Sequence, residues 1–314
     1  MRQNEVTFIL ARLMKKFNKD HRNCLTYLQT LYQNLDPVVS INSGQVFLWE
    51  RHGGSWYGIH GDSVVRFTEA DGGVEFTAFP EDKSCDKKIF RLSDDIRMIF
   101  SEISRDPLIH KLIKAYPGLR LMRQEPHQCL FSFVCASNTN IPMIRRMLHE
   151  LTRKFGRPVK VDGIQFFTFP SAADINRASI DELRTCGLGY RAKAIKAAAD
   201  AVASGRLDFD ALKNKSYQEA KNELLRVYGV GNKIADCVLL FSLEKLDAFP
   251  IDVWIARALV DRYRWLHKKK FGNKVTCQQY EHLSSSARDY FGRYAGYAQQ
   301  YLYYYMRQTA GKKW

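Results

Sequence analysis

A lysine and an aspartate mark the part of this sequence whose residue types and spacing can do chemistry. Lys233 follows Gly229-Val230-Gly231, and Asp252 precedes a run of apolar residues at helical spacing. Because glycine reaches positive φ without strain, the hairpin predicts a tight turn, with a second helix starting at about Asn232. The first turn of a helix has free N–H groups and the positive end of the helix dipole, which favour a phosphate ligand and a neutral amine. A neutral lysine is a nucleophile that forms Schiff bases.

The second helix carries a face suited to a flat ligand. Lys233, Cys237 and Phe241 are spaced i, i+4 and i+8, so they line one side of the helix. Asp252 follows Pro250 and stands at the N-cap position of the next helix, where we expect it to stay ionised. The pattern predicts a pocket floored by an amine and two apolar groups, with a carboxylate in the following segment.

These residues carry a family resemblance. The segment from Leu224 to Trp254 resembles the helix-hairpin-helix, Gly/Pro-rich loop and Asp signature of a DNA glycosylase superfamily. Having both Lys233 and Asp252, it is most similar to the 8-oxoguanine DNA glycosylases, and the likeness is strong over about residues 118–314. The resemblance implies an enzyme that flips 8-oxoguanine out of duplex DNA and excises it through a lysine Schiff base. It also implies that the abasic strand is then cleaved by β-elimination, in base-excision repair.

The resemblance also assigns residues to the base pocket. Gly44 matches a glycine whose carbonyl accepts the N7 hydrogen that distinguishes 8-oxoguanine from guanine, and Gln299 matches a glutamine that reads the Watson–Crick edge. Cys237 and Phe241 would lie on one face of the flipped base and Tyr303 on the other. Lys233 would attack C1′, and Asp252 would stabilise the positive charge that develops on the sugar.

Other residues match those that hold the duplex. Asn138 corresponds to an asparagine that fills the vacated space, Tyr190 to a wedge beside it, and Arg191 to an arginine that contacts the estranged cytosine. The residues that would hold the backbone phosphates are Gly229, Gly231 and Val253. Met143 replaces a second cytosine-reading arginine of the eukaryotic members, and methionine donates no hydrogen bond. We therefore expect weak discrimination between bases opposite the lesion.

Two alternative functions fit parts of the pattern. One is a sister helix-hairpin-helix glycosylase for another damaged base, against which Gly44, Gln299 and Cys237 together argue. The other is a DNA-binding module without chemistry, which needs the glycines and the basic charge but has no need of Lys233 together with Asp252.

Composition favours a nucleic-acid partner. The formal charge of +15 at pH 7 suits a polyanion, and we expect double-stranded DNA containing oxidised guanine. The seven cysteines include no C-x-x-C pair, which predicts reduced thiols and no disulfide framework, zinc site or iron–sulfur cluster. No apolar run is long enough to span a membrane. We expect an intracellular protein, cytoplasmic or nuclear, that acts as a monomer without a metal or other cofactor.

The pattern along the chain predicts an α+β fold, with a mostly helical helix-hairpin-helix glycosylase body and a small N-terminal antiparallel β-sheet domain. Residues 1 to about 36 read as helices, and the chain is again helical from about Ile89 to its end. Between them, glycine-containing turns separate short β-rich runs at Val46–Trp49, Trp56–His60, Val64–Thr68 and Val74–Phe79. We place the domains at 1–115 and 116–314, with the hairpin at 224–244. Lys268-Lys269-Lys270 reads as a charged loop.

Overall fold

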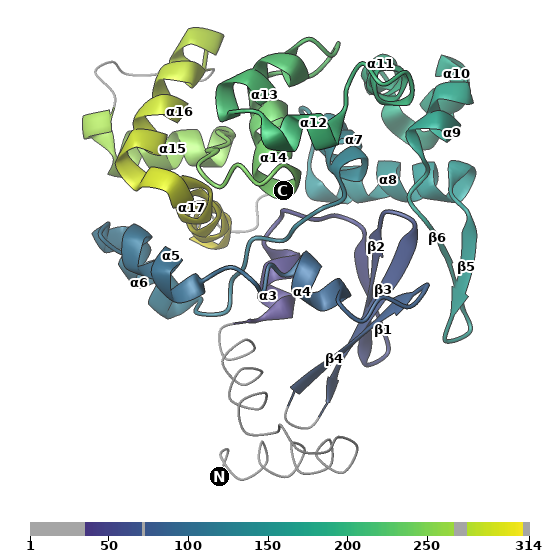
Figure 1. The fold of residues 1–314 in the computed structure, drawn as a ribbon, viewed down its shortest axis with the longest axis horizontal. Helices are drawn as coiled ribbons and strands as arrows, with labels where there is room; N and C mark the ends of the chain where they lie inside the picture. The colour runs from purple at the N-terminus through teal and green to yellow at the C-terminus, as the bar shows by residue number, and fades with distance from the viewer. Residues whose placement is uncertain (1–34, 71–72, 267–274, 310–314) are drawn as a thin grey trace.

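The computed structural model describes residues 35–70, 73–266 and 275–309. It is mostly helical, with a four-stranded antiparallel sheet near the N-terminus (Figure 1), which confirms the expected α+β class. The apolar residues on which the N-terminal helices were predicted, Phe8 to Tyr32, lie outside the described residues, as does Lys268-Lys269-Lys270.

The sheet is a meander in which each strand pairs with the next. Its strands are β1 (Trp49–His52), β2 (Ser55–His60), β3 (Ser63–Ala70) and β4 (Gly73–Phe79). Gly53 and Gly61 have φ of 57° and 59°, as tight hairpin turns require. One face packs in a small core with α3 (Pro37–Asn42) and α4 (Cys85–Ile89), and the other face joins the main core of the helical body.

The first strand begins later than predicted. We expected Val46–Trp49, but the strand starts at Trp49. The reason lies in Gln45, whose buried amide accepts from the Met122 N–H at 2.7 Å and donates to the Arg120 carbonyl at 2.8 Å. Residues before Trp49 are therefore tied to the segment that leads into the helical body instead of to the sheet.

The helical body contains the predicted hairpin unit. Its principal helices are α5 (Ile96–Ile103), α6 (Pro107–Ala115), α7 (Pro126–Cys135), α8 (Ile141–Phe155), α9 (Ala172–Arg177), α10 (Ile180–Leu183), α11 (Arg191–Ala203), α12 (Phe209–Asn214), α13 (Tyr217–Leu225), α14 (Asn232–Ser242), α15 (Val253–Arg262), α16 (Cys277–Phe291) and α17 (Ala295–Thr309). Helix α7 is central, with eight of its ten residues buried, and packs against α14.

A second, two-stranded sheet interrupts the region predicted to be wholly helical. Strands β5 (Pro158–Val161) and β6 (Ile164–Phe167) form a hairpin across Asp162-Gly163. Both turn residues have positive φ, 51° and 80°, and an Asp-Gly pair between alternating apolar residues is a strong hairpin signal. The prediction of continuous helix after Ile89 was therefore wrong here.

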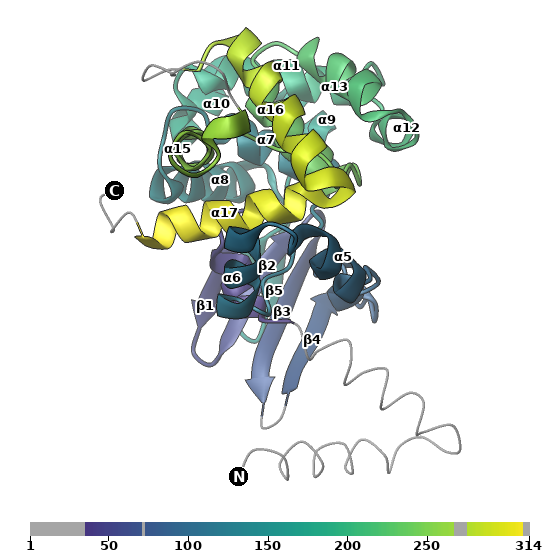
Figure 2. The ribbon, with the colours of Figure 1, turned by 90° about the vertical axis from the view of Figure 1, so that its left-hand side faces the viewer.

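Helix α17 lies where the sheet meets the helical body (Figure 2). Its Gln300 side chain donates to the Ser43 carbonyl at 3.1 Å, and the Tyr301 hydroxyl donates to the Tyr116 carbonyl at 3.1 Å. Helix α17 thus brings its own side chains beside the glycine that follows Ser43. The division into domains at 115 and 116 stays a prediction.

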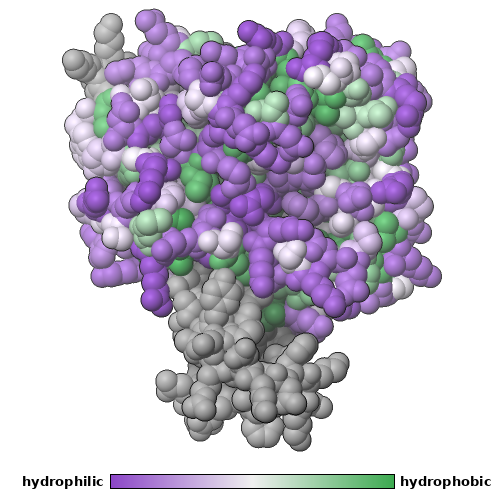
Figure 3. Space-filling model, viewed as in Figure 1, coloured by the Kyte–Doolittle hydropathy of each residue, from purple (hydrophilic) through white to green (hydrophobic). Residues whose placement is uncertain are grey.

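One face of the molecule is largely polar. The face drawn in Figure 3 is mostly hydrophilic, with small scattered apolar patches. None of the helices within the described residues has the length and apolar character needed to cross a membrane.

Candidate active site

The glycine hairpin joins α13 to α14 in the predicted way. Gly229 has φ of 84°, and a Cβ added there would lie 2.3 Å from the Ala194 Cβ, so only glycine fits. Gly231 is the N-cap of α14 and supplies no side chain to cap it. The first N–H groups of α14 therefore remain available to an anion such as a DNA phosphate.

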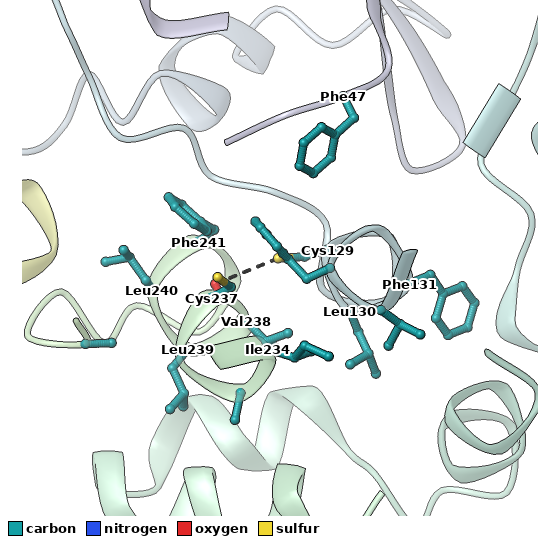
Figure 4. Packing of buried hydrophobic residues seen from close by; sticks show 14 of the residues in the cluster. Phe47, Cys129, Leu130, Phe131, Ile234, Cys237, Val238, Leu239, Leu240 and Phe241 are labelled. Atoms are coloured by element: carbon teal, nitrogen blue, oxygen red, sulfur yellow. Dashed lines mark hydrogen bonds between the residues drawn. The ribbon is translucent and has the colours of Figure 1, made fainter. Parts of the chain in front are cut away.

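The predicted face of α14 exists and meets a cavity. Lys233, Cys237 and Phe241 all line the cavity described below. Figure 4 shows α14 beside Cys129 of α7, whose thiol lies 3.9 Å from the Cys237 carbonyl oxygen. Burial raises the pKa of the Cys237 thiol to about 12, against the opposing effect of Lys233. Cys237 is therefore a neutral wall at physiological pH.

One cavity of about 580 Å³ gathers most of the predicted site residues. Those that line it are Gly44, Asn138, Gly229, Gly231, Lys233, Cys237, Phe241, Asp252, Val253, Gln299 and Tyr303. They come from the loop after α3, the turn before α8, the hairpin, α14, α15 and α17. Residues far apart in the sequence therefore converge on a space large enough for a nucleobase.

The Lys233 amine lies over an aromatic ring. Its Nζ is 4.6 Å from the centroid of Phe133, which also stacks on Phe241 at 5.5 Å between centroids and 11° between planes. Phe133 lines the same cavity. The ring therefore supports the amine and continues the flat wall that Phe241 begins.

Asp252 caps α15, as predicted. Its Oδ1 accepts from the N–H groups of Trp254 at 3.0 Å and Ile255 at 2.9 Å. Burial nevertheless raises the pKa of this carboxyl above the ordinary 3.8, although the Ile255 N–H and Lys233 both oppose the rise. The expectation that the N-cap position alone keeps Asp252 ionised was incomplete, because desolvation outweighs the hydrogen bonds.

Gln299 presents an unused acceptor. Its Nε2 donates to the Pro250 carbonyl at 3.0 Å, which fixes the orientation of the amide. Its Oε1 is buried and has no hydrogen-bond partner in the part of the chain that is described. A buried carbonyl oxygen without a partner is costly, so its presence at the cavity wall favours a ligand with an N–H donor.

Gly44 and Tyr303 form the wall nearest the sheet. Gly44 has φ of 85°, and a Cβ there would lie 2.9 Å from the Tyr303 ring and 2.4 Å from Arg307 Nη1. Any larger residue would have to displace both side chains. Burial raises the pKa of the Tyr303 hydroxyl, so the phenol is neutral at physiological pH, with the Arg307 guanidinium 5.6 Å from its ring centroid.

Tyr190 and Arg191 lie beside Asn138 without lining the cavity. The Tyr190 hydroxyl donates to the Ser137 carbonyl at 3.1 Å, and Arg191 Nη2 donates to the Asn138 carbonyl at 3.3 Å. Asn138 itself has φ of 48°, and Tyr190 is 63% exposed. The three residues therefore lie together, and their contacts with DNA stay predictions.

Phe133 and Tyr280 are among the cavity residues that were not predicted from the sequence. Phe133 stood in the apolar run of a buried helix, and Tyr280 stood in a helix with no feature that set it apart. Nothing in their spacing to Lys233 or Asp252 marks them, because both reach the cavity through packing between helices.

Two family models match successive parts of the chain. Residues 28–130 match the family described as 8-oxoguanine DNA glycosylase, N-terminal domain, and residues 131–279 match the HhH-GPD superfamily base excision DNA repair protein family. The chain is 29% identical to the N-glycosylase/DNA lyase OGG1 of Arabidopsis thaliana over 88% of this chain and 78% of that protein. It is 30% identical to a probable N-glycosylase/DNA lyase of Methanothermobacter thermautotrophicus, over 70% of this chain and 73% of that protein.

Solved structures give the same result. The 8-oxoguanine glycosylase/lyase of Clostridium acetobutylicum, in complex with double-stranded DNA containing cytosine opposite 8-oxoG, superposes with a TM-score of 0.79 at 30% identity. The match covers 88% of this chain and 93% of that one. A 3-methyladenine DNA-glycosylase of Archaeoglobus fulgidus shares the fold, with a TM-score of 0.66 at 20% identity. The chain belongs to the 8-oxoguanine DNA glycosylase family, within the HhH-GPD superfamily of base excision DNA repair proteins.

Proposed function

We propose that Lys233 and Asp252 carry out the chemistry of this protein in the cavity between α14 and α17. The protein is a DNA N-glycosylase and DNA lyase that acts on 8-oxoguanine. One observation carries the assignment of the residues. One cavity, large enough for a nucleobase, is lined by the helix N-terminal lysine, a buried carboxylate and a glutamine with an unpartnered acceptor.

Lys233 is the nucleophile. Its amine attacks C1′ of the flipped nucleotide through the nitrogen lone pair, a nitrogen–C1′ bond forms, and the base leaves with the electron pair of the glycosidic bond and takes up a proton. The sugar ring opens to a Schiff base on Nζ. Loss of a proton from C2′ then expels the 3′ phosphate and cuts the strand, and water releases the lysine.

Asp252 stabilises the positive charge on the sugar. Its carboxylate lines the same cavity as Lys233, and burial strengthens its interaction with a cation. The two capping hydrogen bonds use Oδ1. We assign the contact with the reacting sugar to Oδ2.

Two acceptors in the cavity wall recognise the base. The Gly44 carbonyl accepts the hydrogen on N7 of 8-oxoguanine, and Gln299 Oε1 accepts a donor from the Watson–Crick edge. The base stacks between Cys237 and Phe241 on one side and Tyr303 on the other, at about 1–3 kcal/mol for each stack.

The duplex is held by backbone amides and by two side chains. The N–H groups at Gly229, Gly231 and Val253 bind phosphates, and Val253 is 61% exposed at the start of α15. Asn138 and Tyr190 fill the gap left by the flipped base. Since every one of these residues comes from one chain, we propose that the protein acts as a monomer. Because its substrate is DNA, we propose that it acts in the cytoplasm or the nucleus.

Substrate choice tests the pocket assignment. Single-turnover excision is measured on duplexes that carry 8-oxoguanine, guanine or 3-methyladenine at one position. We expect excision of 8-oxoguanine alone, because only this base has both the N7 hydrogen and the guanine edge. In Gln299→Leu, which removes the unpartnered acceptor, the rate should fall by about 10-fold or more. Faster excision of 3-methyladenine than of 8-oxoguanine by the native chain would contradict the assignment.

Opposite-base preference tests the role of Met143. This side chain is 40% exposed near the start of α8 and donates no hydrogen bond. We expect excision rates opposite cytosine and opposite adenine to agree within about 10-fold, since a good bidentate contact is worth about 1–3 kcal/mol. Met143→Arg should increase the preference for cytosine. If the native protein prefers cytosine to adenine by much more than about 10-fold, and Met143→Arg does not change that preference, Arg191 is sufficient to read the cytosine.

A further inference from the structure

The segment that carries Asp252 is fixed to the helical body at two backbone atoms. The Pro250 carbonyl accepts from Gln299 Nε2 of α17 at 3.0 Å. The Ile251 N–H donates to the Tyr280 hydroxyl of α16 at 3.1 Å. Tyr280 is buried, so no bulk water competes for this bond. The position of Asp252 thus depends on one phenol oxygen as well as on the pocket glutamine.

The same hydroxyl is bonded to the helix that carries Lys233. Tyr280 donates its O–H to Asp236 Oδ2 at 2.7 Å, and Asp236 lies on α14 one turn after the lysine. A phenol has one hydrogen to donate and lone pairs that accept, and Tyr280 uses both. Its oxygen therefore links α14 directly to the backbone next to Asp252.

Buried partners hold the Asp236 end of this link. The Tyr217 hydroxyl donates to Oδ1 at 2.6 Å, and Lys221 Nζ lies 3.4 Å from the carboxylate. Asp236 and Lys221 are both fully buried, and Lys221 also lies 3.1 Å from Glu281. A charged group buried to this degree keeps one geometry, because movement would leave it unpaired. Burial raises the pKa of Tyr280 well above its ordinary value, so the phenol remains the donor.

We propose that Tyr280 is a positioning residue that sets the placement of Asp252 relative to Lys233 through the chain Asp236–Tyr280–Ile251. It acts on the reaction through the two residues it connects. The proposal rests on the proposed function, because it takes Lys233 and Asp252 as the reacting pair. Their side chains lie on different helices, so their relative placement depends on contacts of this kind.

Two phenylalanine variants separate this role from general stability. Tyr280→Phe removes the hydroxyl that contacts both Asp236 and Ile251. Tyr263→Phe is the matched control, because it also removes a buried hydroxyl that donates to a buried carboxylate, that of Asp106, but touches neither Asp236 nor residues 250–252. For each variant we measure the melting temperature, the affinity for a duplex with an uncleavable tetrahydrofuran site, and the single-turnover excision rate of 8-oxoguanine.

We expect Tyr280→Phe to lower the excision rate by about 10- to 100-fold, the effect expected when a reacting group is displaced by about 1 Å. Affinity for the uncleavable duplex should be unchanged. Tyr263→Phe should lower the melting temperature by a similar amount and leave the rate within about threefold of the native rate, because Asp236 and the Asp252 segment keep their contacts. Equal rates in the two variants, whether both native or both slow, would overturn the proposal.

Two further variants keep the test decisive. If Tyr280→Phe does not fold, Asp236→Asn loosens the same link from its other end and should also slow excision without loss of binding, and a native rate would overturn the proposal. Lys233→Gln is measured alongside. If that variant still excises the base, the proposed function has failed. If it is inactive while Tyr280→Phe is native, only the positioning role has failed.

Discussion

Replacing Lys233 with glutamine should lower strand cleavage at 8-oxoguanine on the order of 10⁴-fold or more, the scale seen when a nucleophile is removed. Glutamine keeps a polar side chain in the first turn of α14 but cannot form a Schiff base. The hairpin amides and Gly231 are unchanged, so binding to the damaged duplex should persist. Single-turnover cleavage and binding to the uncleavable duplex are measured on the same preparation.

The control for this variant is Lys114→Gln. Lys114 lies in the last turn of α6 and is exposed. Lys114→Gln removes one positive charge, as Lys233→Gln does. We expect it to cleave at the native rate. Cleavage by Lys233→Gln within about 10-fold of native would show that another amine carries the reaction, because the loss of a true nucleophile costs far more.

Replacing Asp252 with asparagine should lower the excision rate by about 10²- to 10³-fold, the effect of removing one electrostatic contact to a transition state. Asparagine is as good an N-cap as aspartate, so α15 keeps its cap to Trp254 and Ile255. The substitution therefore removes the charge while it retains the local fold. Asp252→Ala serves as the contrasting variant, since it should lose about 1 kcal/mol of stability as well.

The pH dependence of the excision rate gives a second test of Asp252→Asn. Burial raises the pKa of Asp252 above 3.8, so the native excision rate should rise with pH along a limb centred above that value. The limb should be absent in Asp252→Asn. Because the pKa of the Asp252 carboxyl is raised in the folded state, the native protein loses stability as pH rises through that pKa. At neutral pH, Asp252→Asn should therefore melt at the native temperature or higher. A native-like rate and limb in the variant would rule out a role for this charge.

Local patterns were enough to place the reacting groups on their elements. The face of Lys233, Cys237 and Phe241 follows from helical periodicity alone, and the capping role of Asp252 follows from its place before an apolar run. The hairpin at Gly229 is local as well. These features depend on the sequence within a few residues, so the structure reproduces them.

Features that depend on packing were not accessible from the sequence. Phe133 lies under Lys233 only because α7 packs on α14, and Tyr280 reaches Ile251 only because α16 passes behind the pocket. The raised pKa of Asp252 reflects burial by several elements, which its N-cap position does not reveal. The late start of β1 has a similar origin, since Gln45 bonds to a segment more than seventy residues away. By contrast, the Asp162-Gly163 hairpin was a local signal that was overlooked.

The most direct measurement identifies the residue that carries the sugar. The native protein is incubated with a duplex containing 8-oxoguanine opposite cytosine, reduced with borohydride to fix the Schiff base, and digested for peptide mass spectrometry. The account predicts one sugar adduct, on Lys233, which disappears in Lys233→Gln and forms more slowly in Asp252→Asn. An adduct on another lysine or on the N-terminal amine, or base excision without any adduct, would contradict it.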